Sequence, residues 1–302
     1  MKVLFIYFDT ASSEPPRIGM GVAYLSAYLK KSRHASKLCY FRSSEDINHV
    51  LTIIKEWSPN IIAYSATTSS FFSISDVTKK VKADFPDLFQ ICGGYHISMC
   101  PDEFLNRPEL DAICVGYGEQ HLLELAEAIQ NGKKYLNIRN IFFRHNGKII
   151  KNALRPFPKE LDSFMPCDRQ IFMHELRRFS IPIPFGGIFG ENLQEFIFCR
   201  GCPFDCSFCC NHAFKKMGVG KYICYPSVSK CIKNNLFKKE ENQKIFKERK
   251  DTILKLSYFT NEFMQFYLKN FKNLIQFEYL SNKYKIIKKL LPLNLRNQKI
   301  IA

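Results

Sequence analysis

Apolar runs of strand length alternate with helix-like segments along the first half of the chain, and this alternation limits the possible folds most strongly. The predicted strands cover residues 2–8, 37–41, 61–65, 89–94 and 112–115, and the predicted helices cover 18–29, 43–57, 73–84 and 120–130. Each strand is apolar throughout, which is typical of parallel strands buried on both faces. With right-handed crossovers, the pattern predicts a doubly wound α/β sheet over residues 1–152.

A predicted hairpin closes this first domain. Asn146 and Gly147 separate two short apolar runs within residues 141–150, and an Asn-Gly pair is typical of a tight hairpin turn. Prolines then punctuate the chain at Pro156, Pro158, Pro166, Pro182 and Pro184. Because proline interrupts regular structure, we expect a linker over residues 153–192.

Small and hydroxylated residues follow three of the predicted strands. They are Ser65, Thr67 and Thr68 after the third strand, Gly93 and Gly94 after the fourth, and Gly116 and Gly118 after the fifth. Ligands of doubly wound sheets bind beyond the carboxyl ends of the strands, where glycine lets them approach the backbone. The alternative is that each glycine only makes a tight turn. Three such endings on one edge favour a ligand site.

Three cysteines stand close together after the linker. Cys202, Cys206 and Cys209 have the spacing CxxxCxxC, so their thiols can converge on one small inorganic cluster. Three ligands leave one iron of a four-iron cluster open, whereas a structural zinc site normally needs four. The spacing favours an iron–sulfur cluster. A zinc-binding regulatory protein that adds Cys210 or His212 is the alternative hypothesis.

The composition excludes several classes of protein. The 302 residues include 12 cysteines and no apolar run as long as the ~20 residues of a membrane helix, and we expect a reducing, cytoplasmic location. We expect most of the isolated cysteines to be small buried apolar residues, namely Cys39, Cys92, Cys114 and Cys167. Residues 211–302 carry 20 basic and 6 acidic side chains. They follow no nucleic-acid motif, so nucleic-acid binding is not expected.

Residues 1–232 resemble the radical S-adenosylmethionine enzymes that carry a cobalamin-binding domain. The N-terminal resemblance rests on Ile18-Gly19-Met20-Gly21, Ser65-Ala66-Thr67-Thr68, Gly93-Gly94-Tyr95-His96 and Gly116-Tyr117-Gly118-Glu119. The family usually has Gly-Glu-Gly-Glu at the last of these, so Tyr117 is a departure. The segment from Arg200 to Cys209 matches the family's cysteine motif, including the aromatic Phe208 before the third cysteine.

The resemblance implies cofactors and chemistry. Cys202, Cys206 and Cys209 would ligate a [4Fe–4S] cluster, and its open iron would chelate S-adenosylmethionine, with Phe208 beside it. Reductive cleavage would give a 5′-deoxyadenosyl radical for methyl transfer or cyclisation on an unknown small molecule. An electron donor such as flavodoxin or ferredoxin is implied. Cobalamin contacts would come from Gly19, Ser65, Thr67, Thr68, Gly93, Gly94, Gly116, Gly118 and Glu119. His96 is expected to be a capping residue rather than an axial ligand.

Residues 193–302 are similar to the start of the family's (β/α) barrel. Leu193–Cys199 is the expected first strand and 227–232 the first helix, and residues 252–256, 261–271 and 274–279 are expected to form strand, helix and strand. A complete barrel takes ~250 residues, so we expect a truncated barrel. A partner chain would then complete its open edge. The alternative hypothesis is a catalytically incomplete module that binds cobalamin and a cluster.

Overall fold

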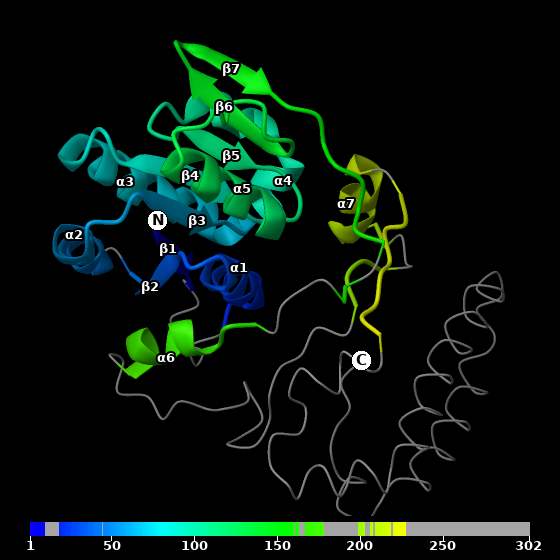
Figure 1. The fold of residues 1–302 in the computed structure, drawn as a ribbon, viewed down its shortest axis with the longest axis horizontal. Coiled ribbons are helices and arrows are strands. Elements are labelled where there is room, and N and C mark those ends of the chain that lie inside the picture. Colours follow the sequence, from blue (N-terminus) through cyan, green and yellow to red (C-terminus); the bar gives the residue numbers. More distant parts are fainter. Residues whose placement is uncertain are drawn as a thin grey trace, which may run out of the picture. The chain divides into compact units, whose positions relative to one another are not determined.

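The computed structural model describes residues 1–9, 18–43, 45–159, 161–162, 167–177, 199–202, 206–207, 209–218 and 220–227. The chain divides into two compact units, Met1–Leu236 and Phe237–Ala302. All of the described residues lie in the first unit, and they are drawn in colour in Figure 1.

A seven-stranded sheet forms the centre of the first unit (Figure 1), in the order β2-β1-β3-β4-β5-β6-β7. The strands are β1 (Lys2–Phe8), β2 (Ala35–Phe41), β3 (Ile61–Ser65), β4 (Phe89–Gly93), β5 (Ala112–Cys114), β6 (Ile141–His145) and β7 (Lys148–Lys151). Strands β1 to β5 pair in parallel, and β6 and β7 are antiparallel. The predicted doubly wound α/β sheet is confirmed.

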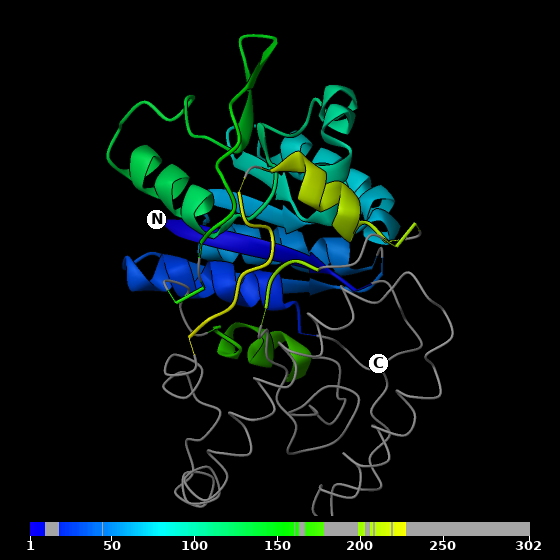
Figure 2. The same ribbon diagram turned by 90° about the vertical axis from the view of Figure 1, so that its right-hand side faces the viewer.

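Helices cover both faces of this sheet, as the two views in Figures 1 and 2 show. The helices of the described residues are α1 (Met20–Lys31), α2 (Asp46–Trp57), α3 (Thr68–Asp84), α4 (Tyr95–Met99), α5 (Glu119–Gln130), α6 (Gln170–Arg177), α7 (Asn211–Met217) and the 3₁₀ helix η1 (Pro101–Asn106). Successive residues of β1 point to opposite faces. Leu4 and Ile6 pack with α2 and α3, while Val3 and Phe5 pack with α1 and α5.

The local structure differs from the prediction in several places, one of which is helix α6 within the predicted linker over residues 153–192. Helix α3 begins at Thr68 rather than near Ser73, because Thr67 and Ser70 form a capping box. Helices α4 and η1 occupy a stretch with no predicted element. The hairpin turn is confirmed, since Asn146 (φ 49°) and Gly147 (φ 72°) both adopt the left-handed backbone that such a turn requires.

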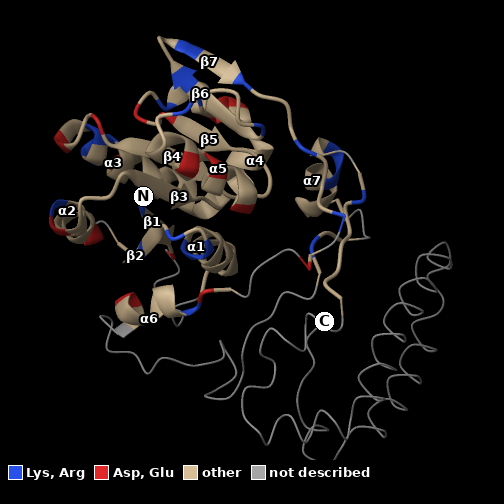
Figure 3. Cartoon of the chain, in the orientation of Figure 1, with Lys and Arg blue, Asp and Glu red and all other residues tan. Residues whose placement is uncertain are grey.

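Charged side chains of both signs are interspersed over the helices and turns of the first unit (Figure 3). This agrees with the 24 basic and 22 acidic residues among the first 210. Within the described ranges, no helix is both long and apolar enough to span a membrane. The expected barrel strand Leu193–Cys199, apart from Cys199, and the expected elements from residue 228 onward lie outside the described residues.

Candidate cofactor-binding site

A cavity of about 550 Å³ opens at the carboxyl ends of β3, β4 and β5. Two parts of the chain form its walls. One is the sheet edge with the first turns of α1 and α5. The other is the cysteine segment, by which we mean the described residues between 199 and 227. Six of the predicted cofactor residues line the cavity: Ser65, Gly93, Gly94, Gly116, Gly118 and Glu119.

Several side chains that line the cavity are apolar. They are Ala63 of β3, Ile91 of β4, Leu25 of α1 and Leu122 of α5. Cys114 also contributes, and burial raises the pKa of its thiol to about 12, so that it stays protonated at neutral pH. This part of the cavity lining suits a flat apolar group rather than a charged one.

Three predicted cofactor residues do not line this cavity. Gly19 lies against the Tyr7 ring, Thr67 caps α3, and the Thr68 hydroxyl lies 3.3 Å from His96 Nδ1. The imidazole of His96 packs on the Phe71 ring at a centroid distance of 4.0 Å. His96 therefore lies at a helix start beside the cavity and contributes no side chain to its lining.

A buried ion pair attaches the cysteine segment to the sheet edge. The Arg200 guanidinium donates to the Glu119 carboxylate, and the two side chains are only 10% and 6% exposed. Glu119 is the first residue of α5, where the helix dipole favours a carboxylate. Burial alone would lower the pKa of Arg200, but Glu119 offsets this and raises that pKa, so the guanidinium remains charged.

Two tyrosines flank the Arg200 guanidinium. Its central carbon lies 4.8 Å from the centre of the Tyr117 ring and 5.3 Å from that of Tyr24. Aromatic rings at such distances stabilise a guanidinium. The departure from the family pattern at Tyr117 thus has a physical role, because an aromatic side chain there supports Arg200.

The three cluster-type cysteines lie on one loop before α7. Cys202 and Cys209 are half-buried and Cys206 is exposed, and the Cys209 N–H donates to the Cys206 carbonyl at 3.1 Å. The Asn211 side-chain amide donates to Cys209 Sγ at 3.4 Å and accepts a hydrogen bond from the Tyr222 hydroxyl at 3.0 Å. Phe208 and residues 203–205 lie outside the described residues.

This donor set fits an iron–sulfur cluster. Its thiols come from one short loop, and a neutral amide donates toward one sulfur, as is common around thiolate ligands. The other isolated cysteines match the prediction in part: Cys39, Cys92 and Cys114 are buried, whereas Cys167 is only half-buried.

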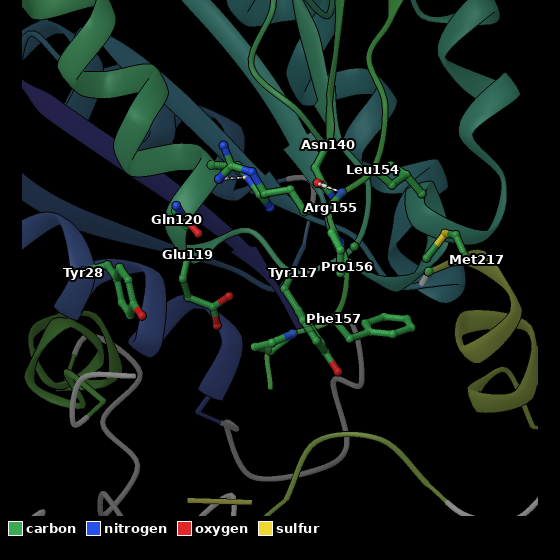
Figure 4. Close-up of a pocket in the computed structure, with 14 residues that line it drawn as sticks. Tyr28, Tyr117, Glu119, Gln120, Asn140, Leu154, Arg155, Pro156, Phe157 and Met217 are labelled. Carbon is green, nitrogen blue, oxygen red and sulfur yellow. Dashed lines mark hydrogen bonds between the residues drawn. The ribbon is translucent and has the colours of Figure 1, made fainter. Parts of the chain in front are cut away.

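A smaller cavity of about 150 Å³ lies beside the first and shares Gly116, Tyr117 and Glu119 with it (Figure 4). Arg155 lies in its wall and bonds the Glu124 carboxylate through both terminal nitrogens, at 2.8 and 2.9 Å. The sequence did not indicate this second cavity, because its walls come from α5 and from the predicted linker.

His121 on the wall of the smaller cavity predicts a pH-dependent stability. Burial, with the nearby Arg155 guanidinium, lowers the pKa of His121 to about 4. An unfolded histidine has a pKa near 6.5, so between these values the unfolded chain binds the extra proton. The contribution of neutral His121 to the free energy of unfolding is therefore complete above about pH 6.5 and is lost as the pH falls toward 4. Between pH 7 and pH 5, we expect the free energy of unfolding to fall by on the order of 2 kcal/mol less in His121→Asn than in the unchanged chain.

Urea denaturation of both proteins at the two pH values measures this difference. The exposed His145 provides the control, since His145→Asn should keep the pH dependence of the unchanged chain. The same pH dependence in His121→Asn as in the unchanged chain would contradict the assignment.

Comparison with known proteins bears on this site directly. Residues 9–126 match the family model of the B12 binding domain, and they include the strand ends that line the large cavity. This stretch of the chain is therefore similar to a B12 binding domain. The predicted resemblance to cobalamin-binding radical S-adenosylmethionine proteins is confirmed by its relatives as well.

Two curated relatives illustrate this. The chain is 26% identical over 216 residues to an uncharacterized methyltransferase, PH0819, of Pyrococcus horikoshii, covering 69% of this chain and 45% of the relative. It is 28% identical over 235 residues to the anaerobic magnesium-protoporphyrin IX monomethyl ester cyclase of Rubrivivax gelatinosus, covering 71% and 39%. The chain therefore spans less than half the length of these relatives.

Solved structures share the fold of this chain. The cobalamin-dependent S-adenosylmethionine radical enzyme OxsB, with aqua-cobalamin and S-adenosylmethionine bound, superimposes with a TM-score of 0.61 at 19% identity, covering 77% of this chain and 31% of OxsB. The radical S-adenosylmethionine methyltransferase TsrM from Kitasatospora setae gives a TM-score of 0.56 at 15% identity, covering 77% and 44%. At these identities the likeness concerns the fold.

Proposed function

We propose that the chain binds cobalamin in the large cavity and a [4Fe–4S] cluster with S-adenosylmethionine at the cysteine segment. It would use them for methyl transfer or cyclisation on a small molecule. One observation carries the proposal: the edge of a B12-binding domain and the segment that bears Cys202, Cys206 and Cys209 enclose the same cavity. Two cofactors that act together need such adjacent sites.

The cavity has the chemistry that cobalamin requires. Cobalamin combines a wide, flat corrin ring with a nucleotide tail that ends in an apolar aromatic base. The glycines at the strand ends would allow a large ring to approach the backbone, and the apolar side chains of Ala63 and Ile91 suit the base. His96 packs on Phe71 outside the cavity lining, which favours binding without an axial histidine from this position.

The cysteine segment would supply the cluster ligands. When bound, the cluster would supply the electron for reductive cleavage of S-adenosylmethionine. Cys202, Cys206 and Cys209 would hold the irons, and the Asn211 amide would orient the Cys209 sulfur. The Arg200–Glu119 ion pair would hold the segment against the domain that binds cobalamin.

Several finer features belong to the same proposal. The domain boundaries would fall at residues 152 and 192, and a partner chain would complete the barrel edge. The electron donor would be a flavodoxin or a ferredoxin, and the reducing conditions that the cluster needs indicate a cytoplasmic location.

Anaerobic reconstitution of the full chain with iron and sulfide tests the proposal. We expect about four irons per chain, a visible charge-transfer band, and 5′-deoxyadenosine when S-adenosylmethionine and a strong reductant are added. Cys206→Ala should lose the iron and keep its far-ultraviolet circular dichroism, while Cys210→Ala serves as the matched control and keeps both. Added cobalamin should shift its visible spectrum on binding.

Three results would count against the proposal. Stoichiometric zinc in place of iron would favour the zinc-binding regulatory protein. Full iron content in Cys206→Ala would remove the ligand assignment. A chain that loads both cofactors but forms no 5′-deoxyadenosine would be a cofactor-binding module without turnover.

A further inference from the structure

A second group of metal-binding side chains lies at the outer edge of the sheet, away from both cavities. Cys39 is on the edge strand β2, His49 is on α2, and Glu175 is on α6. One ligand atom from each, namely a sulfur, a ring nitrogen and a carboxylate oxygen, lies within 4.8 Å of the other two. None of the three residues lines either cavity.

The three side chains are held in place by the fold. Cys39 is fully buried, the Glu175 side chain is 4% exposed, and that of His49 is 29% exposed. His49 Nε2 lies 3.0 Å from Glu175 Oε2, which also accepts the N–H of Tyr40 at 3.1 Å. That N–H lies on the outer side of β2, the edge strand of the described sheet. The Glu175 carboxylate therefore accepts a hydrogen bond from this backbone N–H and also faces His49.

Thiolate, imidazole and carboxylate are the ligands that zinc prefers. Zinc binds sulfur at about 2.3 Å and nitrogen or oxygen at about 2.0 Å, so a tetrahedral site spaces its ligand atoms about 3.3–3.6 Å apart. The three atoms would reach these spacings with shifts of roughly one ångström. Three protein ligands leave one position for water.

A divalent cation would use all three groups, namely the thiol, the imidazole and the carboxylate. We propose that Cys39, His49 and Glu175 form a zinc site that ties α6 to β2 and α2. The site would fix α6, which precedes the cysteine segment in the chain.

Cobalt and zinc salts alone are the probes. The full chain with Cys202, Cys206 and Cys209 changed to serine removes the cluster ligands, so the result is independent of the proposed function. We expect one Co²⁺ per chain with a thiolate-to-cobalt charge-transfer band in the near ultraviolet, which zinc abolishes by displacement. Zinc should also raise the thermal unfolding temperature of this protein.

Substitutions in that background identify the ligands. Cys39→Ser should remove the charge-transfer band, and His49→Ala and Glu175→Gln should each weaken cobalt binding at least tenfold. Cys92→Ser is the matched control, because Cys92 is also fully buried in the same core, and it should keep the band. His49→Ala changes a half-exposed helical residue, so it tests the site even if Cys39→Ser fails to fold. No cobalt binding, or a band and affinity unchanged in Cys39→Ser and His49→Ala, would overturn the proposal.

Discussion

The Gly94→Ala variant is expected to lose about 3–5 kcal/mol of unfolding free energy. Gly94 has φ 99° and ψ −177°, a region of backbone space that is almost restricted to glycine. An added Cβ would lie 2.5 Å from the Ala66 carbonyl oxygen and 2.8 Å from the Ala66 nitrogen. Both are backbone atoms of the neighbouring strand end and cannot rotate away. The variant must therefore separate the ends of β3 and β4, which line the cavity.

Urea denaturation followed by circular dichroism measures this loss, and Gly21→Ala is its control. Gly21 is in helix α1, and a Cβ there would meet no atom within 4 Å. Alanine should therefore stabilise this helix by up to about 1 kcal/mol. We also expect Gly94→Ala to bind cobalamin far more weakly than the unchanged chain. Equal urea midpoints for the two variants would show that the close approach at Gly94 is not required.

The Arg200→Met variant is expected to release the cysteine segment from the sheet edge. It leaves the Glu119 carboxylate, which is only 6% exposed, without its guanidinium partner. Removing one member of a buried ion pair typically costs about 3–5 kcal/mol. We expect this cost to appear as lost hydrogen-exchange protection in residues 199–227, with the central strands still protected, and as weaker cobalamin binding.

A double-mutant cycle with Glu119→Gln separates the ion pair from packing. The double variant should be less destabilised than the sum of the single variants, because neither charge is then left buried alone. The exposed pair Lys151–Asp102 provides the control, since Lys151→Met should cost no more than about 1 kcal/mol. Strictly additive effects of Arg200→Met and Glu119→Gln would show that the two side chains do not stabilise each other.

The sequence predicted the sheet well because its physical cause is local. The apolar runs at 2–8, 61–65 and 89–94 are buried from both sides, and no other secondary structure of that length buries them so completely. Helix α4 and η1 were missed because residues 95–106 show no helical period. Helix α4 is instead held by the hydrogen bond from the His96 N–H to the Ala66 carbonyl, just after β3. Here tertiary contacts, rather than local preference, decide the structure.

The sequence could predict only those residues of the candidate site that the parallel order of the strands brings together. Ser65, Gly93 and Gly116 reach the same cavity because the carboxyl ends of parallel strands meet at one edge. The Glu119–Arg200 pair joins residues 81 positions apart, so no spacing in the sequence reveals it. The role of Tyr117 became visible only with this pair in place.

The walls of the large cavity come from two stretches of chain far apart in sequence. A cofactor bound there would therefore hold these two stretches together. A ligand that contacts both walls binds only when the cysteine segment lies against the sheet edge, so it stabilises that arrangement by mass action. At a ligand concentration one hundred times the dissociation constant, this stabilisation is about 2.7 kcal/mol. Cobalamin supply would then govern how long the cysteine segment stays docked. Without the cofactor, Cys202 and Cys209, which are half-buried in this structure, would become as open to oxidation as the exposed Cys206.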